Sequence, residues 1–158
     1  MSGHRGSGRD ETPEERVDRN LEELLGELRV ILPGVQVLFA FLLVVPFNQR
    51  FADVSTFQKY LYLATLLFAA GASACLIAPS IHHRITFRTQ DKEYLVQRAN
   101  RLTIVGGILL AISMTGAIWL IAGYLFGDAV TAVAALTVAG TFAVLWYGVP
   151  LRRLRQNR

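Results

Sequence analysis

The sequence predicts an all-α fold, an integral membrane bundle of four transmembrane helices with an N-terminal amphipathic cytoplasmic helix. Two observations lead to this prediction. Apolar residues make up 53% of the 158 residues and charged residues only 18%, below the usual ~25%. The charged residues are also clustered, which leaves four long runs without them. At ~1.5 Å per residue, a helix over any of these runs can cross most or all of a ~30 Å hydrocarbon core.

The first part of the chain divides into a tail and a helix. Residues 1–11 are polar and lack periodicity, which predicts a disordered tail. Residues 12–29 are predicted to form an amphipathic juxtamembrane helix, because apolar residues recur at helical spacing with glutamates off that face. Its start has the pattern of a capping box: Thr12 at the N-cap, Pro13 at the first helical position and Glu15 three residues after the cap.

The four-helix transmembrane domain is predicted over residues 30–151, followed by a basic tail over 152–158. Its spans are expected at about 30–48, 60–81, 102–126 and 129–150. Pro79 and Pro150 are expected to end the second and fourth spans, because proline cannot donate to the preceding turn of a helix.

Three further patterns concern how the spans are joined and packed. Small residues from Ala69 to Cys75 allow close backbone approach and predict a packing seam on the second span. The helical pattern that leads into the third span meets no proline or glycine before Gly106, so this helix is expected to enter the span unbroken. Gly127-Asp128 is the whole turn between the last two spans, which favours an antiparallel hairpin.

The basic residues predict the topology. Of 16 lysines and arginines, only Arg50 and Lys59 fall in the connections that follow the first and third spans. The positive-inside rule then places both termini and the middle connection in the cytoplasm of a multi-pass protein of the cell (inner, plasma) membrane. The same distribution argues against a nucleic-acid partner. It favours the lipid bilayer as partner, with anionic lipid headgroups at the cytoplasmic face.

Residues that carry chemistry are scarce. No Asp, Glu, Lys, Arg or His lies in the central part of any span, where such residues mark proton relays and ion paths. There is no phosphate-binding glycine loop, no metal-ligand cluster and no nucleophile paired with a base. The sequence therefore predicts no enzyme, no cofactor and no metal site.

Two groups of candidate functional residues remain. The first group combines a charged pair at the start of the first span with a helix-bending pair and an amide inside it; the second follows the second span. They are Glu27, Arg29, Pro33, Gly34 and Gln36, and His82, His83 and Arg84. For Glu27 the alternative is one carboxylate in a solvated row of charges. For the histidines it is a pair of interfacial polar residues that touch lipid headgroups.

Several of these residues belong to a longer pattern. The run LxELRVILPGVQVLFAFLLVVPF, then RFADVS, then AP, IHHR and FR after the second span, resembles an uncharacterised family of small four-span actinobacterial membrane proteins. Some members are labelled sodium:proton antiporter. The resemblance extends from about Leu21 to Leu151, and it implies no established activity. The matching motif residues are Glu27, Arg29, Pro33, Gly34, Gln36, Phe41, Pro46, Phe47, Arg50, Phe51, Pro79, His82, His83 and Arg84.

Two functions follow as hypotheses. The first is a structural or accessory membrane protein that binds lipid or a membrane protein partner through its cytoplasmic face. It is favoured by uncharged spans and by basic residues gathered on one side. The alternative is a small cation or proton transporter or channel. A homo-oligomer is expected in that case, because four short spans enclose little room for a pathway. This alternative is indicated by Pro33-Gly34 beside Gln36 and by Glu27 and Arg29 at the cytoplasmic mouth.

Overall fold

The computed structural model describes residues 12–85 and 92–156, and it confirms an all-helical fold. Four helices are long and apolar enough to cross a membrane. They are α1 (Pro13–Val44), α2 (Thr56–Ile85), α3 (Lys92–Leu125) and the last helix, which begins as α4 (Asp128–Phe142). That last helix continues through a π-helical segment, η3 (Ala143–Gly148), into α5 (Val149–Gln156). Two short 3-10 segments, η1 (Val45–Phe47) and η2 (Gln49–Asp53), connect α1 to α2.

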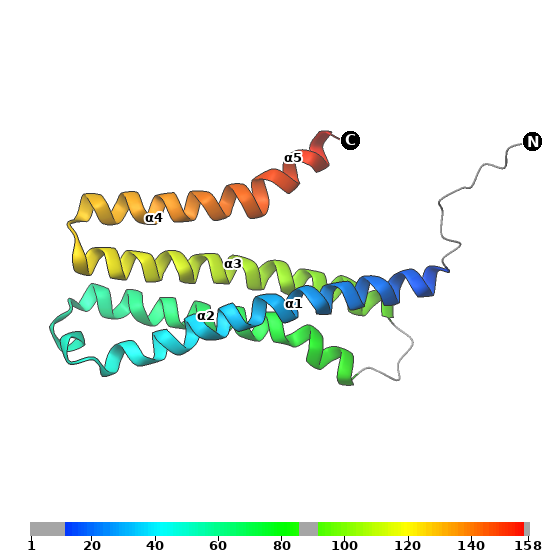
Figure 1. Ribbon diagram of the computed structural model, residues 1–158, viewed down its shortest axis with the longest axis horizontal. Coiled ribbons are helices and arrows are strands. Elements are labelled where there is room, and N and C mark those ends of the chain that lie inside the picture. The colour runs from blue at the N-terminus through cyan, green and yellow to red at the C-terminus, as the bar shows by residue number, and fades with distance from the viewer. Residues whose placement is uncertain (1–11, 86–91, 157–158) are drawn as a thin grey trace, which may run out of the picture.

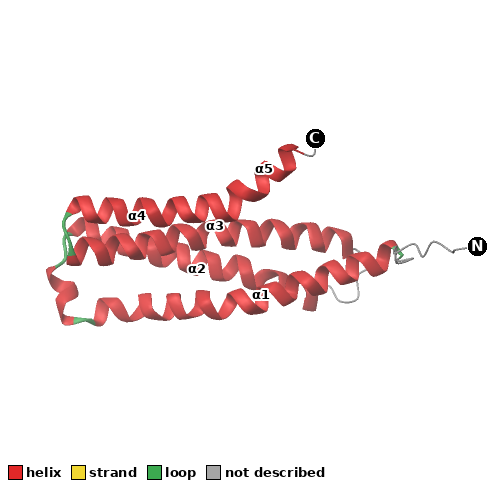
Figure 2. Cartoon of the chain, turned by 45° about the horizontal axis from the view of Figure 1, so that its top comes forward, coloured by secondary structure: helices red, strands yellow, loops and turns green. Residues whose placement is uncertain are grey.

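The long helices lie side by side along one axis (Figures 1 and 2). The turns between α1 and α2 and between α3 and α4 meet at one end, called here the hairpin end. The first residues of α1 and α3 and the last residues of α2 and α5 lie at the other end, called here the terminal end. The predicted tail over residues 1–11 and the last two residues of the predicted basic tail lie outside the described residues.

The helix α1 joins the predicted amphipathic segment and the first span without a break. The predicted capping box is present: the Thr12 side chain accepts from the Glu15 backbone N–H, and the Glu15 carboxylate accepts from the Thr12 N–H. The charged first turns also hold an ion pair of 3.0 Å between Arg19 and Glu23. Pro33 lies inside the helix, which continues to Val44.

Two prolines expected to end spans lie within continuing helices. Pro79 is fully buried inside α2, which runs six residues further to Ile85. Around Pro150 the helix widens first: the Val149 N–H donates to the Val144 carbonyl, a step of five residues. A widened turn relieves the clash between a proline ring and the preceding carbonyls. Helical structure therefore continues to Gln156, through most of the predicted basic tail.

The core lies between α1, α2 and α3. One cluster is centred on Leu28 and Val35 of α1, Leu76 of α2 and Leu110 of α3. The predicted seam of small residues is part of the core, because Ala69 and Ala72 have no exposed surface. The most extensive contact is between α2 and α3, as small residues on both helices permit.

The fourth helix is attached differently. In the described part of the chain, α4 packs against α3 and does not reach α1 or α2. Thr131 and Ala135 are its buried residues, and its remaining surface is largely exposed. The predicted hairpin is present, since α3 ends at Leu125 and α4 begins at Asp128. The fold is therefore a three-helix bundle with a fourth helix on the outer side of α3 (Figure 1).

A hydrogen bond between α2 and α3 gives the first testable prediction. The buried Ser113 hydroxyl donates to the Thr65 carbonyl at 2.9 Å. We expect Ser113→Ala to lower the free energy of unfolding by about 0.6 kcal/mol and by at most about 1.7 kcal/mol, the range for hydrogen bonds between membrane helices. Unfolding of the purified protein in mixed micelles by SDS, followed by circular dichroism, measures this difference.

The matched control is Thr137→Ala. The exposed Thr137 hydroxyl donates to the Val133 carbonyl of its own helix at 2.7 Å, so it joins no two helices. We expect this variant to leave the free energy of unfolding nearly unchanged. Equal losses in both variants would contradict a role for Ser113 in joining α2 to α3.

Candidate functional site

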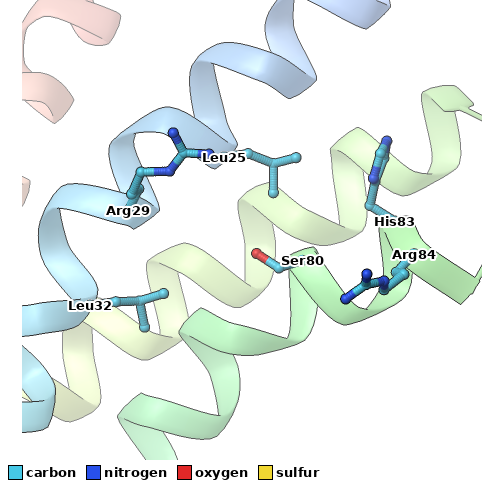
Figure 3. Close-up of a pocket in the computed structure, with 6 residues that line it drawn as sticks. All are labelled: Leu25, Arg29, Leu32, Ser80, His83 and Arg84. Carbon is cyan, nitrogen blue, oxygen red and sulfur yellow. The ribbon is translucent and has the colours of Figure 1, made fainter.

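A pocket of about 610 Å³ lies between α1 and α2 near the terminal end of the bundle. Its lining residues are Leu25, Arg29 and Leu32 of α1 and Ser80, His83 and Arg84 of α2. Figure 3 shows the side chains of Leu25, Leu32 and Ser80 pointing into the space between the two helices. The Arg29 side chain runs toward Leu25, while His83 and Arg84 leave α2 in different directions.

Helical periodicity explains how the sequence builds this pocket. Leu25, Arg29 and Leu32 are spaced four and three residues apart, so they share one face of α1. On α2, His83 and Arg84 follow Ser80 by three and four residues and therefore lie one turn away from it. The continuation of α2 beyond Pro79 is what carries these two residues along α1. Had the helix ended at Pro79, their placement against α1 would be lost.

The pocket is basic with apolar walls. Two guanidinium groups, an imidazole and a hydroxyl line it, and none of the six lining residues is acidic. Arg29 belongs to α1 and Arg84 to α2, so each of the two helices contributes a cationic group to the pocket. Guanidinium groups are well suited to phosphate and carboxylate oxygens. Leu25 and Leu32 add apolar surface, which suits an anion that carries a hydrocarbon part.

The structure brings together three of the eight candidate residues, Arg29, His83 and Arg84. His82, adjacent to His83, is half-buried and does not line the pocket, as expected for neighbours on a helix. The remaining candidates are exposed on α1 and do not line the pocket. These are Glu27, Pro33, Gly34 and Gln36.

Three lining residues were not predicted: Leu25, Leu32 and Ser80. Their signal in the sequence is the spacing to the candidates. Leu25 and Leu32 are four and three residues from Arg29, and Ser80 is four residues before Arg84. This spacing shows that they share a face with the candidates. It does not show that those two faces meet.

The described residues contain no group of three His, Cys, Asp or Glu side chains placed to hold a metal ion. A second cavity, of about 450 Å³, lies at the hairpin end between α1, α2 and α3. Its lining is mostly aliphatic and aromatic. At its edge the Tyr62 hydroxyl donates to the Leu42 carbonyl at 2.8 Å, and Phe51 packs edge-on against the Tyr62 ring.

The chain matches the family model described as "Family of unknown function (DUF6328)" over residues 10–150. The match includes α1, α2, α3 and α4 and every residue of the pocket. The chain therefore belongs to this family, which confirms the expectation of an uncharacterised family. No curated protein and no solved structure matches the chain.

Proposed function

We propose that this member of the DUF6328 family is an accessory protein of the cell (inner, plasma) membrane that binds anionic phospholipid in the pocket between α1 and α2. In this proposal the four long helices span the bilayer, and the terminal end faces the cytoplasm with both chain termini. The supporting observation is the pocket itself, which Arg29, His83 and Arg84 line together with Ser80 and two leucines. The chemistry performed is binding, and no reaction is proposed.

The depth of the pocket supports a headgroup as its ligand. Arg29 directly precedes Val30, where the uncharged run of the first span begins. In the proposed orientation, the guanidinium groups therefore lie where lipid phosphates meet the hydrocarbon core. Leu32 continues from that level along α1 toward the hairpin end and offers an apolar surface to the part of the lipid just below its phosphate, whereas Leu25 lies one turn on the other side of Arg29. The pocket thereby recognises the phosphate together with the apolar part of the lipid next to it.

Replacing both pocket arginines tests the proposal. We expect Arg29→Gln/Arg84→Gln to weaken binding of phosphatidylglycerol about tenfold or more, because each hydrogen bond to a charged group contributes about 1.5–3 kcal/mol. Binding of phosphatidylcholine with the same acyl chains is expected to stay weak and unchanged. Native mass spectrometry of the detergent-solubilised protein, titrated with each lipid, measures both affinities.

The matched control removes the same amount of charge at the same end. Arg153 and Arg155 are exposed on α5 and do not line the pocket. We expect Arg153→Gln/Arg155→Gln to retain most of the affinity for phosphatidylglycerol. If both double variants lose affinity equally, diffuse attraction explains the binding and the proposed site is wrong. If the unaltered protein binds both lipids equally, the proposed function is wrong.

The alternative function is a small oligomeric cation or proton transporter or channel. Two of its candidate residues, Glu27 and Gln36, are exposed on α1 and lie nine positions apart in the sequence. At ~3.6 residues per turn, this separation places them on opposite sides of the helix. Among the residues whose side chains the structure describes, no Asp, Glu, Lys, Arg or His is buried, and the buried Thr65, Ser113 and Thr131 are not ionisable. Proton flux in proteoliposomes that is abolished by Glu27→Gln would favour the alternative over lipid binding.

A further inference from the structure

Gln36 is a polar residue within the uncharged run of the first span. Its amide is exposed on α1 inside the uncharged run that begins at Val30. It makes no hydrogen bond to any residue that the structure describes. The hydroxyls of Tyr62 and Ser73 in α2, in contrast, both donate to backbone carbonyls, at 2.8 and 2.9 Å. An amide without a partner is costly in hydrocarbon. Its partner is therefore to be sought beyond the residues that the structure describes.

The position of Gln36 relates it to the basic pocket. Leu25, Arg29, Leu32 and Gln36 are spaced four, three and four residues apart, so all four lie on one stripe of α1. The first three line the pocket, and Gln36 is the next residue of that stripe toward the hairpin end. It lies about 10 Å along the helix from Arg29, at ~1.5 Å per residue. Helical side chains lean toward the N-terminus, which directs the Gln36 amide back toward the pocket.

We propose that Gln36 donates a hydrogen bond to an ester carbonyl of the phospholipid whose phosphate lies in the pocket. This inference rests on the proposed function and adds a specificity-determining residue to the same site. A glycerophospholipid carries its charged phosphate and its ester carbonyls in that order from the membrane surface inward. The stripe of α1 presents groups that match these two in the same order, the Arg29 guanidinium first and the Gln36 amide deeper.

The site should then distinguish lipids whose acyl chains are ester-linked from lipids whose chains are ether-linked. An ester carbonyl oxygen is a good acceptor for an amide N–H, whereas an ether-linked lipid has no carbonyl at this position. We expect diester phosphatidylglycerol to bind about two- to tenfold more tightly than its diether analogue of equal chain length, the effect of one net hydrogen bond. In Gln36→Met, which keeps the length and loses the donor, the diester affinity should fall to the diether value.

The experiment titrates the full-length, detergent-solubilised protein with both lipids by native mass spectrometry. Gln97→Met is the control, because Gln97 is exposed on α3 and lies outside the pocket; it should keep the preference for the diester. No diester preference in the unaltered protein would overturn the inference. So would an equal loss of both lipids in Gln36→Met, which would indicate a structural role. A dimer that becomes a monomer in Gln36→Met would show that the amide pairs with a second copy instead.

The two proposals fail in different ways. If phosphatidylglycerol binds no better than phosphatidylcholine whatever its linkage, the proposed function is wrong. If diester and diether phosphatidylglycerol bind equally well, and both depend on Arg29 and Arg84, the pocket stands as an anion site. Only the role of Gln36 is then overturned.

Discussion

Leu76→Ala is expected to lower the free energy of unfolding by about 2 kcal/mol or more, near the lower end of the range for buried leucines. Leu76 is 1% exposed and belongs to the core cluster to which α1, α2 and α3 all contribute. Removing its side chain leaves a cavity between three helices at once. The expected loss of stability is at the lower end of that range because a bilayer surrounds Leu76 with apolar lipid even when the helices separate. The main cost of the substitution is therefore the lost packing contacts.

A leucine on the outer surface of the same helix provides the control. Leu67 is 62% exposed, so lipid or detergent replaces the contacts that its side chain loses. We expect Leu67→Ala to change the free energy of unfolding by no more than about 0.5 kcal/mol. Unfolding by SDS in mixed micelles compares the two variants directly. Similar losses would contradict the described packing of α2 against α1 and α3.

The number and kind of helices could be predicted from the sequence. Four uncharged runs correspond to four long helices. In the hydrocarbon core of a bilayer every backbone polar group of a spanning segment must be hydrogen-bonded within the protein, and a helix meets this requirement along its whole length. The start of α1 was also predictable, since a capping box involves contacts within four residues. The unbroken entry of α3 into its span followed from the absence of proline and glycine before Gly106.

The effect of the internal prolines could not be predicted from local rules. Proline lacks one donor and disturbs one turn, and a helix can accept this cost where neighbouring turns or helices compensate. Pro79 is buried inside α2, and the π-helical segment η3 precedes Pro150. Both helices therefore extend beyond the expected span ends, and the extension of α2 places His83 and Arg84 beside α1.

The membership of the candidate site required tertiary structure. Periodicity indicates which residues share a face of α1, but not which of its faces meets α2. Arg29 proved to face the pocket, whereas Glu27, two residues earlier, does not line it. The contacts of α4 likewise could not be predicted without the tertiary structure. A short turn predicts that α4 pairs with α3, but the sequence does not show that α1 and α2 lie beyond its reach.

Gly116→Ala is expected to destabilise the protein by up to about 2 kcal/mol, although alanine is the better helix former. Gly116 lies where α3 crosses α2, and an added Cβ would overlap the Thr65 hydroxyl oxygen. Thr65 is 2% exposed and its hydroxyl donates to the Leu61 carbonyl at 2.7 Å, so it has little room to move. Overpacking costs about 1–3 kcal/mol, and the gain in helix propensity of about 1 kcal/mol offsets part of it.

Gly140→Ala should have the opposite sign, which makes it the matched control. A Cβ at Gly140 meets no atom within 4 Å, so only the gain in helix propensity remains. The cause of the Gly116 effect can be tested further with Thr65→Ala, which removes the overlapping hydroxyl and methyl groups. The double variant Gly116→Ala/Thr65→Ala should lose less stability than the sum of the two single variants, because residues in contact are not additive. Strict additivity would show that α2 and α3 do not meet at these residues.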